Sequence, residues 1–431
     1  MSHSVPMART GFDRFGLNEA LVRGIRAAGF KNPRPIQLKT IPAGLDGDDV
    51  LGLAQTGTGK TAAFALPLLH RLLEDRRGGP RALVLAPTRE LATQIAVEIR
   101  LLSKFTRLKT TTVFGGVSMH NQIRALRGHP EIVVGCPGRV LDLIQRGVLH
   151  LGKVETLVLD EADHMFDMGF LPDIRKIMSA LPARRQNLLF SATMPKDIRR
   201  LADDLLRNPH VVELADTAPA ATVDHALYLV SEPRKRALLE HMLRSDDCDS
   251  AIVFTRTKHR ARRLAEQLSK AGHRAVGLQG NMSQGQRDRA MSGFRTRRYD
   301  ILVATDIAAR GIDVNDVSHV INFDVPNTPE AYTHRIGRTG RSEKTGVAYT
   351  FVTSNDRGWV RSTESMIGAP IPRRRIEGFE HETETTSQQR PARGSWSHQN
   401  GRGRQNGRRN GPQSRSRHKS GGHGRNQKRA S

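Results

Sequence analysis

Cysteine is scarce in this sequence, and long apolar runs are missing from it. The two cysteines among its 431 residues, Cys136 and Cys248, lie far apart and outside any metal-ligand spacing. A disulfide scaffold and a zinc site are therefore not expected, and a reducing compartment is favoured. No apolar run reaches the length of a membrane span, and residues 1–10 lack a signal-peptide core. We expect a soluble, cytoplasmic protein without a membrane partner.

Acidic residues are few relative to basic ones. The chain has 68 Lys and Arg against 43 Asp and Glu, a net charge of +25, which favours a polyanionic partner. The charge is uneven, because residues 381–431 hold twelve Lys or Arg and two Glu, a net charge of +10, and leave +15 for the rest.

The C-terminal segment, residues 378–431, consists largely of Gly, Arg, Asn, Gln and Ser, with Trp396 as the one aromatic residue after 380. Such a segment cannot bury enough apolar surface to offset chain entropy, so it is predicted to be a disordered basic tail. Its Gly-Arg repeats suit sequence-tolerant binding to a nucleic-acid backbone. The alternative is an inert tail that keeps the protein in solution.

Short apolar runs alternate with helical segments through most of the chain. The predicted strands are 50–54, 82–86, 111–114, 132–135, 156–160 and 187–191, then 251–255, 275–279, 301–305, 319–323 and 348–352. This alternation predicts an α/β fold, with parallel sheets that carry helices on both faces. A small-residue stretch separates the two series. The predicted units are an N-terminal segment (1–38), a first domain (39–214), a linker (215–224), a second domain (225–377) and the tail (378–431).

A glycine-rich turn follows the first predicted strand and opens a helical pattern. Its residues are Ala54, Gln55, Thr56, Gly57, Thr58, Gly59, Lys60 and Thr61. In such a turn, backbone N–H groups surround a phosphate, the lysine reaches the β- and γ-phosphates, and the threonine hydroxyl ligates magnesium. Ala54 replaces the glycine that usually begins the pattern. The sequence predicts a site for a nucleoside triphosphate with Mg²⁺; the second half has no such loop.

An acidic tetrad, residues 160–163, directly follows the predicted strand 156–160. The carboxyl end of a parallel strand is where open α/β sheets present their functional groups. Asp160 is suited to hold Mg²⁺, Glu161 is suited to orient or deprotonate a water molecule, and Asp163 remains available for another contact. Without the phosphate loop upstream, a solvated turn would explain the tetrad equally well.

Further motifs occur along the chain in a fixed order. They are residues 29–37, 87–92, 115–116, 136–139, 191–193, 304–313 and 334–341. Together with the phosphate loop and the tetrad, they make the chain from residue 12 to residue 352 resemble the DEAD-box ATP-dependent RNA helicases of superfamily 2, and most of all the bacterial RhlE group. The resemblance implies two tandem RecA-like domains. Cys136, Gln279 and Asn281 depart from the commoner family pattern.

The resemblance implies a role for individual residues in ATP binding and hydrolysis. Gln37 would hydrogen-bond adenine, Phe30 would stack on it with support from Phe12, and Asp313 would contact the nucleotide. Core packing is the alternative for both phenylalanines. The catalytic residues implied are Lys60, Asp160, Glu161, Arg338 and Arg341. The two arginines would act as fingers on the γ-phosphate, which a planar and permanently charged guanidinium group suits.

The resemblance also implies RNA contacts and a coupling network. The RNA-binding residues implied are Pro87, Thr88, Arg89, Gly115, Gly116, Pro137, Gly138, Arg139, Thr305 and Arg310. The residues implied to couple the two domains are Asp163, Ser191, Thr193, His334 and Arg335. Helix capping is an alternative or additional role for Ser191 and Thr193.

The expected function is therefore ATP hydrolysis on RNA, with local separation of short duplexes or remodelling of RNA–protein particles. The cofactors expected are ATP and Mg²⁺, and the partner expected is RNA read through its backbone. Ribosomal precursors and RNA-turnover proteins remain equal candidates as further partners. An ATP-gated RNA clamp or annealing chaperone is the alternative function, and a DNA helicase is a third.

Overall fold

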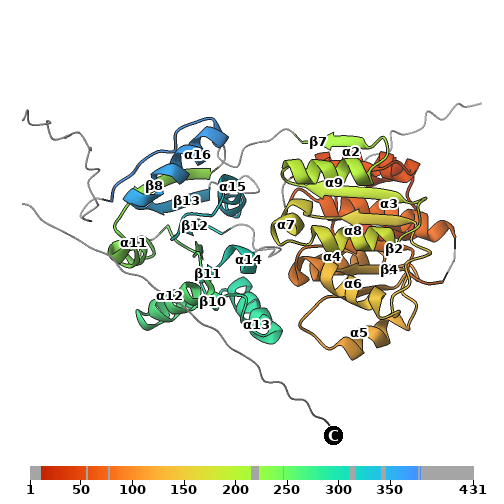
Figure 1. Ribbon diagram of the computed structural model, residues 1–431, viewed down its shortest axis with the longest axis horizontal. Coiled ribbons are helices and arrows are strands. Elements are labelled where there is room, and N and C mark those ends of the chain that lie inside the picture. Colours follow the sequence, from red (N-terminus) through yellow and green to blue (C-terminus); the bar gives the residue numbers. More distant parts are fainter. Residues whose placement is uncertain are drawn as a thin grey trace, which may run out of the picture. The chain divides into compact units, whose positions relative to one another are not determined.

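The computed structural model describes residues 11–54, 57–75, 78–214, 223–245, 247–309, 317–340, 346–376 and 379. The strands of these residues form two separate parallel sheets, each with helices on both faces (Figure 1). The α/β class expected from the alternation of apolar runs and helical segments is confirmed. In the described part of the chain, no helix combines the length and the apolar character that crossing a membrane requires.

The first sheet has seven strands among the described residues, in the order β3-β4-β2-β5-β6-β1-β7. The strands are β1 (Val50–Leu53), β2 (Ala82–Leu85), β3 (Thr110–Val113), β4 (Ile132–Gly135), β5 (Thr156–Leu159), β6 (Gln186–Ser191) and β7 (His210–Glu213). All neighbours are parallel, so the strands end at one common edge.

The helices around this sheet divide between its faces. The 3-10 helix η1 (Gly11–Phe15) precedes α1 (Glu19–Ala27), α2 (Pro35–Asp46), α3 (Lys60–Glu74) and α4 (Arg89–Leu102). These elements bury their apolar side chains in one cluster. The opposite cluster takes apolar side chains from α5 (Met119–Leu126), α6 (Pro137–Gln145), α7 (Ala162–Asp167), α8 (Leu171–Ser179) and α9 (Lys196–Leu205). Each face of the sheet therefore has its own core.

The second sheet has six strands in the described residues, in the order β10-β11-β9-β12-β13-β8. They are β8 (Val223–Leu229), β9 (Ala251–Phe254), β10 (Ala275–Leu278), β11 (Ile301–Ala304), β12 (His319–Asn322) and β13 (Gly346–Val352), again all parallel. The helical elements are η2 (Glu232–Arg234), α11 (Lys235–Met242), α12 (Lys258–Lys270), α13 (Gln284–Arg295), α14 (Asp306–Ala309), α15 (Pro329–Ile336), η3 (Ser354–Asp356) and α16 (Arg357–Ile367).

Burial on both faces explains why the strands read as continuous apolar runs. In β5, Leu157 and Leu159 belong to one core cluster, and Val158 between them belongs to the other. Successive side chains of a strand point to opposite faces, and here both faces are covered by helices. In central strands such as β2, β4 and β5, polar side chains are therefore found at the strand ends, where the predicted motifs lie.

Two strands were not expected from the sequence. Three of the four residues of β7 are exposed, so its sequence lacks the apolar run of the central strands. In β8, Asp224 and His225 interrupt the apolar pattern, and the strand begins at Val223, inside the predicted linker. Residues 215–222 of that linker, and all of the predicted tail except Phe379, lie outside the described residues.

Candidate functional site

The predicted motifs of the first sheet occupy two adjacent groups of strands. The phosphate loop follows β1, the acidic tetrad follows β5, and the Ser-Ala-Thr motif follows β6. The three predicted RNA motifs follow β2, β3 and β4. In the sheet, β3-β4-β2 lie together and β5-β6-β1 lie beside them, and the pair β2–β5 joins the two groups. One edge therefore carries the groups predicted for both ligands.

The phosphate loop ends where helix α3 begins, at Lys60. Gly57 and Gly59 have φ angles of 88° and 95°, in the left-handed region that favours glycine. The Lys60 ammonium donates a hydrogen bond to the backbone oxygen of Ala54 at 3.0 Å and lies 3.8 Å from Oδ1 of Asp160. Thr61 is in the first turn of α3, and Gln55 and Thr56 lie outside the described residues.

The Gln37 amide contacts the phosphate loop directly. Its Nε2 donates to the backbone oxygen of Gly59 at 3.1 Å, and its Oε1 accepts from the backbone N–H of Arg34 at 2.8 Å. Arg34 in turn donates to the backbone oxygen of Gly57 at 2.6 Å. A side chain at position 59 would overlap the Gln37 amide, which gives a second reason for glycine there. The predicted adenine motif and the phosphate loop therefore form one unit.

The two phenylalanines predicted for this region contact each other. Phe12 is buried, and its ring meets the ring of Phe30 edge-on, with 6.0 Å between the ring centroids. It meets Phe15 at the same distance. Phe12 belongs to the core of the first sheet, so core packing accounts for its position, and Phe30 is partly buried against that core.

Burial and nearby charge act in opposite directions on the first two carboxyl groups of the tetrad. Burial raises the pKa of Asp160 to about 6, although the Lys60 ammonium lowers it. Burial also opposes the ionisation of Glu161, but the charge of His164, a hydrogen bond from His164 and the charges of Lys60 and Arg338 together lower its pKa. Glu161 adopts a left-handed backbone conformation, with φ of 54°, at the start of α7.

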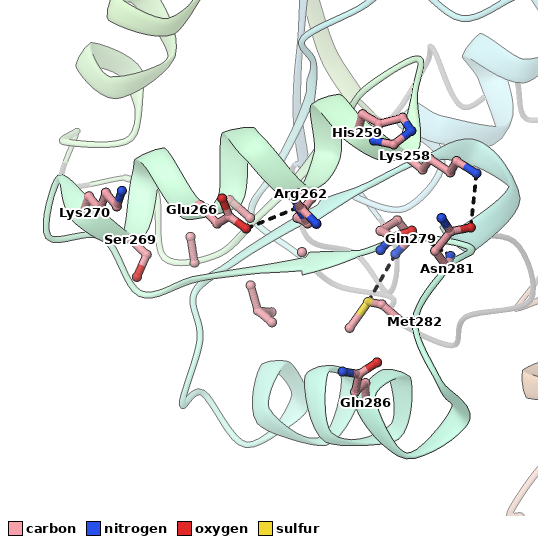
Figure 2. Close-up of a pocket in the computed structure, with 14 residues that line it drawn as sticks. Lys258, His259, Arg262, Glu266, Ser269, Lys270, Gln279, Asn281, Met282 and Gln286 are labelled. Atoms are coloured by element: carbon pink, nitrogen blue, oxygen red, sulfur yellow. Dashed lines mark hydrogen bonds and ion pairs between the residues drawn. The ribbon is translucent and has the colours of Figure 1, made fainter.

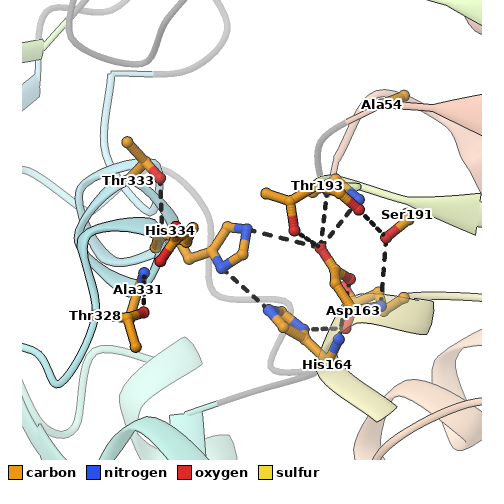
Figure 3. A network of polar contacts seen from close by, with 12 residues as sticks. Ala54, Asp163, His164, Ser191, Thr193, Thr328, Ala331, Thr333 and His334 are labelled. Carbon is orange, nitrogen blue, oxygen red and sulfur yellow. Dashed lines mark hydrogen bonds and ion pairs between the residues drawn. The ribbon is translucent and has the colours of Figure 1, made fainter. Parts of the chain in front are cut away.

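Asp163 is held by the Ser-Ala-Thr motif that follows β6 (Figure 3). Its Oδ2 accepts hydrogen bonds from the backbone N–H groups of Ala192 at 3.2 Å and Thr193 at 3.0 Å, and from the Thr193 hydroxyl at 3.0 Å. Its own N–H donates to the Ser191 hydroxyl at 3.3 Å, and that hydroxyl donates to the Thr193 backbone oxygen at 2.8 Å. The structure thus brings together three residues of the predicted coupling network.

Two histidines extend this network into the second half of the chain. His334, in the last turn of α15, has its Nε2 4.0 Å from Oδ2 of Asp163. Its Nδ1 lies 3.3 Å from Nε2 of His164, whose Nδ1 lies 2.9 Å from Oε2 of Glu161 (Figure 3). Burial, followed by the charge of His164, lowers the pKa of His334 to about 4. The sequence prediction missed His164; its spacing of three residues from Glu161 on a helix was the available signal.

The predicted arginines of the second half have different surroundings. Arg335 is buried and forms an ion pair with Asp306 at 2.5 Å, donates to Asn322 at 3.1 Å and to the backbone oxygen of Asp324 at 2.7 Å. These contacts all lie within the second sheet's own elements, so Arg335 organises that half. Arg338 is also buried, and it lines a pocket with His164 and His334. Arg310, Asp313 and Arg341 lie outside the described residues.

The RNA motifs after β2 and β3 contact one another. Thr88 caps α4 through a hydrogen bond from the N–H of Leu91 at 3.3 Å, and Pro87 before it is buried. Arg89 begins α4, and any side chain at Gly116 would overlap its guanidinium group. Gly116 also has a φ of 75°. The backbone conformation therefore favours glycine at position 116, whereas the overlap alone would only displace the flexible end of Arg89; Gly115 has open space around it.

The RNA motif after β4 forms the first turn of α6. Pro137 is the first helical residue, where its missing N–H costs nothing, and Gly138 is exposed. Arg139 is half-buried, 3.6 Å from Asp142. Cys136 precedes the helix, and burial raises the pKa of its thiol to about 12. In the second half, Thr305 directly follows β11 and is buried rather than exposed.

Two residues of the second half contact the predicted RNA motif after β2, and the sequence prediction missed both of them. Arg287 of α13 forms an ion pair with Glu90 at 2.7 Å, and Gln284 accepts a hydrogen bond from Arg89 at 3.1 Å. Both pairs join residues almost 200 positions apart, so nothing local in the sequence indicates them.

Comparisons with known proteins agree with this arrangement. The family model described as DEAD/DEAH box helicase matches residues 34–201, and the model of the helicase conserved C-terminal domain matches residues 234–343. The ATP-dependent RNA helicase CshA of Listeria monocytogenes is 46% identical over 356 residues, which cover 82% of this chain and 68% of that protein. The DEAD-box ATP-dependent RNA helicase CshA of Geobacillus kaustophilus is 46% identical over 356 residues, which cover 82% of this chain and 76% of that protein.

A solved structure gives the same result for the fold. S. cerevisiae Dbp5 bound to RNA and ADP BeF3 superposes with a TM-score of 0.76 at 34% identity, over 85% of this chain and 96% of that one. The two sheets are accordingly two RecA-like domains in tandem, which we call the first and the second domain. The relatives named above are CshA proteins, so the expected membership of the RhlE group is not supported. The chain belongs to the family of DEAD-box ATP-dependent RNA helicases.

Proposed function

We propose that this chain hydrolyses ATP on RNA and uses the change in nucleotide to separate short duplexes locally or to remodel RNA–protein particles. The observation that supports this most directly is the position of Asp163. Its carboxylate joins the nucleotide edge of the first domain to the Ser191–Thr193 motif and lies 4.0 Å from His334 of the second domain. A group in that position responds both to nucleotide and to the second domain.

ATP would bind across the phosphate loop with Mg²⁺ held by Thr61 and Asp160, partly through water. The fit is supported by chemistry, because Mg²⁺ commonly takes one or two protein oxygen ligands and completes its shell with phosphate and water oxygens. Among the described residues, no group of three His, Cys, Asp or Glu side chains could hold a metal alone. Burial raises the pKa of Asp160 to about 6, a penalty that a bound cation relieves. The cation would supply charge neutralisation at the β- and γ-phosphates.

The remaining roles in hydrolysis belong to side chains around that loop. Lys60 would move from the Ala54 oxygen to the β- and γ-phosphates, and Glu161 would orient or deprotonate the attacking water. Gln37 would read adenine, and Phe30 would stack on it. The contacts of Gln37 and Arg34 with the loop oxygens support this, since they join adenine recognition to the loop conformation.

RNA would lie along the edge formed by the ends of β2, β3 and β4 and continue onto the second domain near Thr305 and Arg310. Exposed glycines and a guanidinium group at helix starts suit phosphate and 2′-OH contacts, which position RNA without reading its sequence. The ion pair of Glu90 with Arg287, at 2.7 Å, supports a continuous path, because it joins the two domains beside Arg89. Thr305 is buried and would need a local shift to reach RNA.

Closure of the two domains would complete the catalytic site. Arg338 and Arg341 would then act on the γ-phosphate from the second domain, and His334 would contact the first domain, while Arg335 holds elements of the second domain together. The position of Arg338 supports this proposal, since its charge is near enough to lower the pKa of Glu161. Asp313 would contact the nucleotide in the same closed state.

The domain limits, location and partners are also proposals. We propose a first domain of 39–214, a linker shortened from 215–224 to 215–222 because Val223 and Asp224 belong to β8, a second domain of 223–377 and a basic RNA-anchoring tail of 378–431. A cytoplasmic location is supported by two cysteines that are both free thiols. Membership of the RhlE group stays a hypothesis, and a comparison with more relatives would test it. Sequencing RNA crosslinked to the protein in its cell would decide between ribosomal precursors and RNA turnover.

The finger role of Arg338 predicts a specific kinetic defect. Arg338→Ala should lower the RNA-stimulated kcat for ATP by about 10³-fold, because the charge that develops on the γ-phosphate loses its partner. The Kd for ATP should change little, since the phosphate loop is intact. The measurement is steady-state ATP hydrolysis with saturating RNA, together with titration of a fluorescent ATP analogue.

Arg361→Ala, on an exposed surface of α16, is the matched control and should retain full turnover. Wild-type turnover in Arg338→Ala would overturn the closure proposal. In the wild type, a duplex-displacement assay should require hydrolysable ATP. Equal displacement with a non-hydrolysable analogue, or none with either, would favour the RNA clamp instead.

The buried carboxylate of Asp163 predicts a pH-dependent contribution to stability. Burial opposes its ionisation, but the charges of His164, His334 and Lys60 outweigh burial and lower its pKa. The stabilising effect of the ionised group is thus complete above its unfolded-state pKa of about 4 and is lost as pH falls below that value. Asp163→Asn should destabilise the first domain by about 2–3 kcal/mol at pH 7, because the amide carries no charge and places an NH2 donor where one carboxylate oxygen accepts a hydrogen bond.

Urea unfolding of both proteins at pH 7 and at about pH 2.5, below the unfolded-state pKa, measures this difference in the free energy of unfolding. The gap between wild type and Asp163→Asn should narrow at the lower pH. A gap of the same size at both pH values would mean that the ionised carboxylate is not what holds the Ser191–Thr193 motif.

A further inference from the structure

The open edge of the second sheet forms the floor of a groove. Among the described strands, β10 pairs only with β11, so its other edge has no strand beside it. Helix α12 packs its apolar side chains into the core on one face of the sheet, and α13 packs into the core on the other face. The edge of β10 therefore lies between the two helices, as Figure 2 shows.

The groove has a volume of about 710 Å³, enough for several residues of an extended chain. Its floor is apolar or small, the side toward α13 carries Met282 with the amides of Gln279, Asn281 and Gln286, and the opposite rim is dominated by cations of α12. The lining residues used here are Lys258, Arg262, Lys270, Val276, Gly277 and Met282. Because α12 rises about 1.5 Å per residue, its cations are spread over roughly 18 Å along the groove. That length equals about five residues of a strand.

The backbone of β10 gives the groove its specificity. An edge strand presents N–H and C=O groups that have no partner in the sheet, which makes it a template for another strand. Val276 and Gly277 are half-buried, so the middle of the edge is reachable. The imidazole of His259 is the one ring among the residues that line the groove, so the groove offers a single stacking surface rather than a series of them. Single-stranded nucleic acid is normally held by stacking on such rings, so RNA is not the favoured occupant.

We propose that this groove binds an extended acidic peptide of a partner protein as an additional strand beside β10. Main-chain hydrogen bonds to β10 supply the affinity, and the cations of α12 select for acidic side chains on the strand. Glu266 pairs with Arg262 at 3.4 Å across an exposed surface, so this ion pair costs little to exchange for a new one. The chain's own tail is a poor occupant, because its net charge of +10 has the same sign as the rim. The proposal does not depend on the roles assigned to ATP and RNA above.

Hydrogen exchange on the full-length protein tests this proposal. The probe is a blocked peptide of about eight residues in which Val and Glu alternate, so that one face is apolar and the other acidic. It should protect the amides of residues 275–278, and a Val–Lys peptide of the same length should not. Arg262→Glu combined with Lys270→Glu should weaken binding at least tenfold. Arg199→Glu combined with Arg200→Glu, on the exposed face of α9, is the matched control and should bind as the wild type does.

RNA-stimulated ATP hydrolysis should be the same in both double variants, which separates this proposal from the helicase function. Three results would overturn the proposal: no protection at millimolar peptide, equal protection by the Val–Lys peptide, or protection of 275–278 by oligouridylate instead. The last result would assign the groove to RNA.

A second inference concerns His164 and follows from its two hydrogen-bond partners. A neutral His164 that donates to Glu161 must accept from Nδ1–H of His334, which leaves the His334 Nε2 lone pair facing Asp163. A doubly protonated His164 donates at 2.9 Å to Glu161 and at 3.3 Å to His334, and leaves N–H of His334 directed at Asp163. Beside a neutral His334, only the second arrangement satisfies every partner; a neutral His164 beside a doubly protonated His334 would also do so, but burial lowers the pKa of His334 and disfavours it.

We infer that His164 is a positioning residue, which holds the Glu161 carboxylate in place and ties it to His334 of the second domain. This inference rests on the proposed role of Glu161 in hydrolysis. Its geometry supports it: His164 is 4% exposed, and its ring meets that of His334 edge-on at 4.8 Å. The lowered pKa of His334, about 4, agrees with a neutral His334 that accepts from His164. Asp306, Arg335 and Arg338 are the other charged groups that line this pocket.

Substitution of His164 separates a positioning role from simple packing. His164→Leu should lower RNA-stimulated kcat about 10–100-fold with little change in KM for ATP, as removal of an orienting partner does. His164→Gln should recover most of the turnover, because its amide can still donate to Glu161. Met165→Ala, a fully buried neighbour on α7 without a polar contact, is the matched control and should reduce stability rather than kcat.

Wild-type kcat in His164→Leu, or an equal fall in Met165→Ala, would overturn the inference. If the wild type itself lacked RNA-stimulated turnover, the proposed function would fail instead, so the two failures are distinguishable.

Discussion

Parallel pairing of the strands in the first domain is the constraint on which the rest of this site depends. Helices bury both faces of the sheet, so the polar groups of its central strands lie at strand ends, and parallel pairing gathers those ends at one edge. The strand order then separates the motifs proposed to bind nucleotide, after β5, β6 and β1, from those proposed to bind RNA, after β3, β4 and β2. Because β2 pairs with β5, the proposed nucleotide site and the proposed RNA site are neighbours on this edge.

Burial of charge is the second determinant, and it explains why the site is incomplete without the second domain. Asp160, Glu161 and Asp163 are each at most 4% exposed, which would destabilise three carboxylates so close together. Lys60, His164 and the N–H groups of the Ser-Ala-Thr motif offset that cost within the first domain. His334 and Arg338 of the second domain supply the remainder. A small movement of that domain therefore changes the electrostatics around the γ-phosphate site, which is what coupling between ATP and RNA requires.

Sequence patterns predicted the parts of this architecture that are local. The phosphate loop, the tetrad and the central strands were recognisable because a strand buried on both faces is a continuous apolar run with a polar end. Strand β7 was not predicted, because three of its four residues are exposed and it therefore lacks a continuous apolar run. The contact of His164 with His334 was not predicted because the two residues lie 170 positions apart. The pair of Glu90 with Arg287 was not predicted for the same reason. Arg335 was expected between the domains, but an arginine can equally organise its own domain, and only the positions of Asp306 and Asn322 distinguish the two.

The central claim is that nucleotide and RNA act on one shared network around Asp163. Linkage requires that the coupling be reciprocal, so the most direct measurement is the Kd for single-stranded RNA with and without a saturating non-hydrolysable ATP analogue. The account predicts that the analogue tightens RNA binding at least tenfold in the wild type, and that Thr193→Val, which loses the hydroxyl bound to Asp163, reduces this factor. Equal RNA affinity with and without the analogue in the wild type would contradict it.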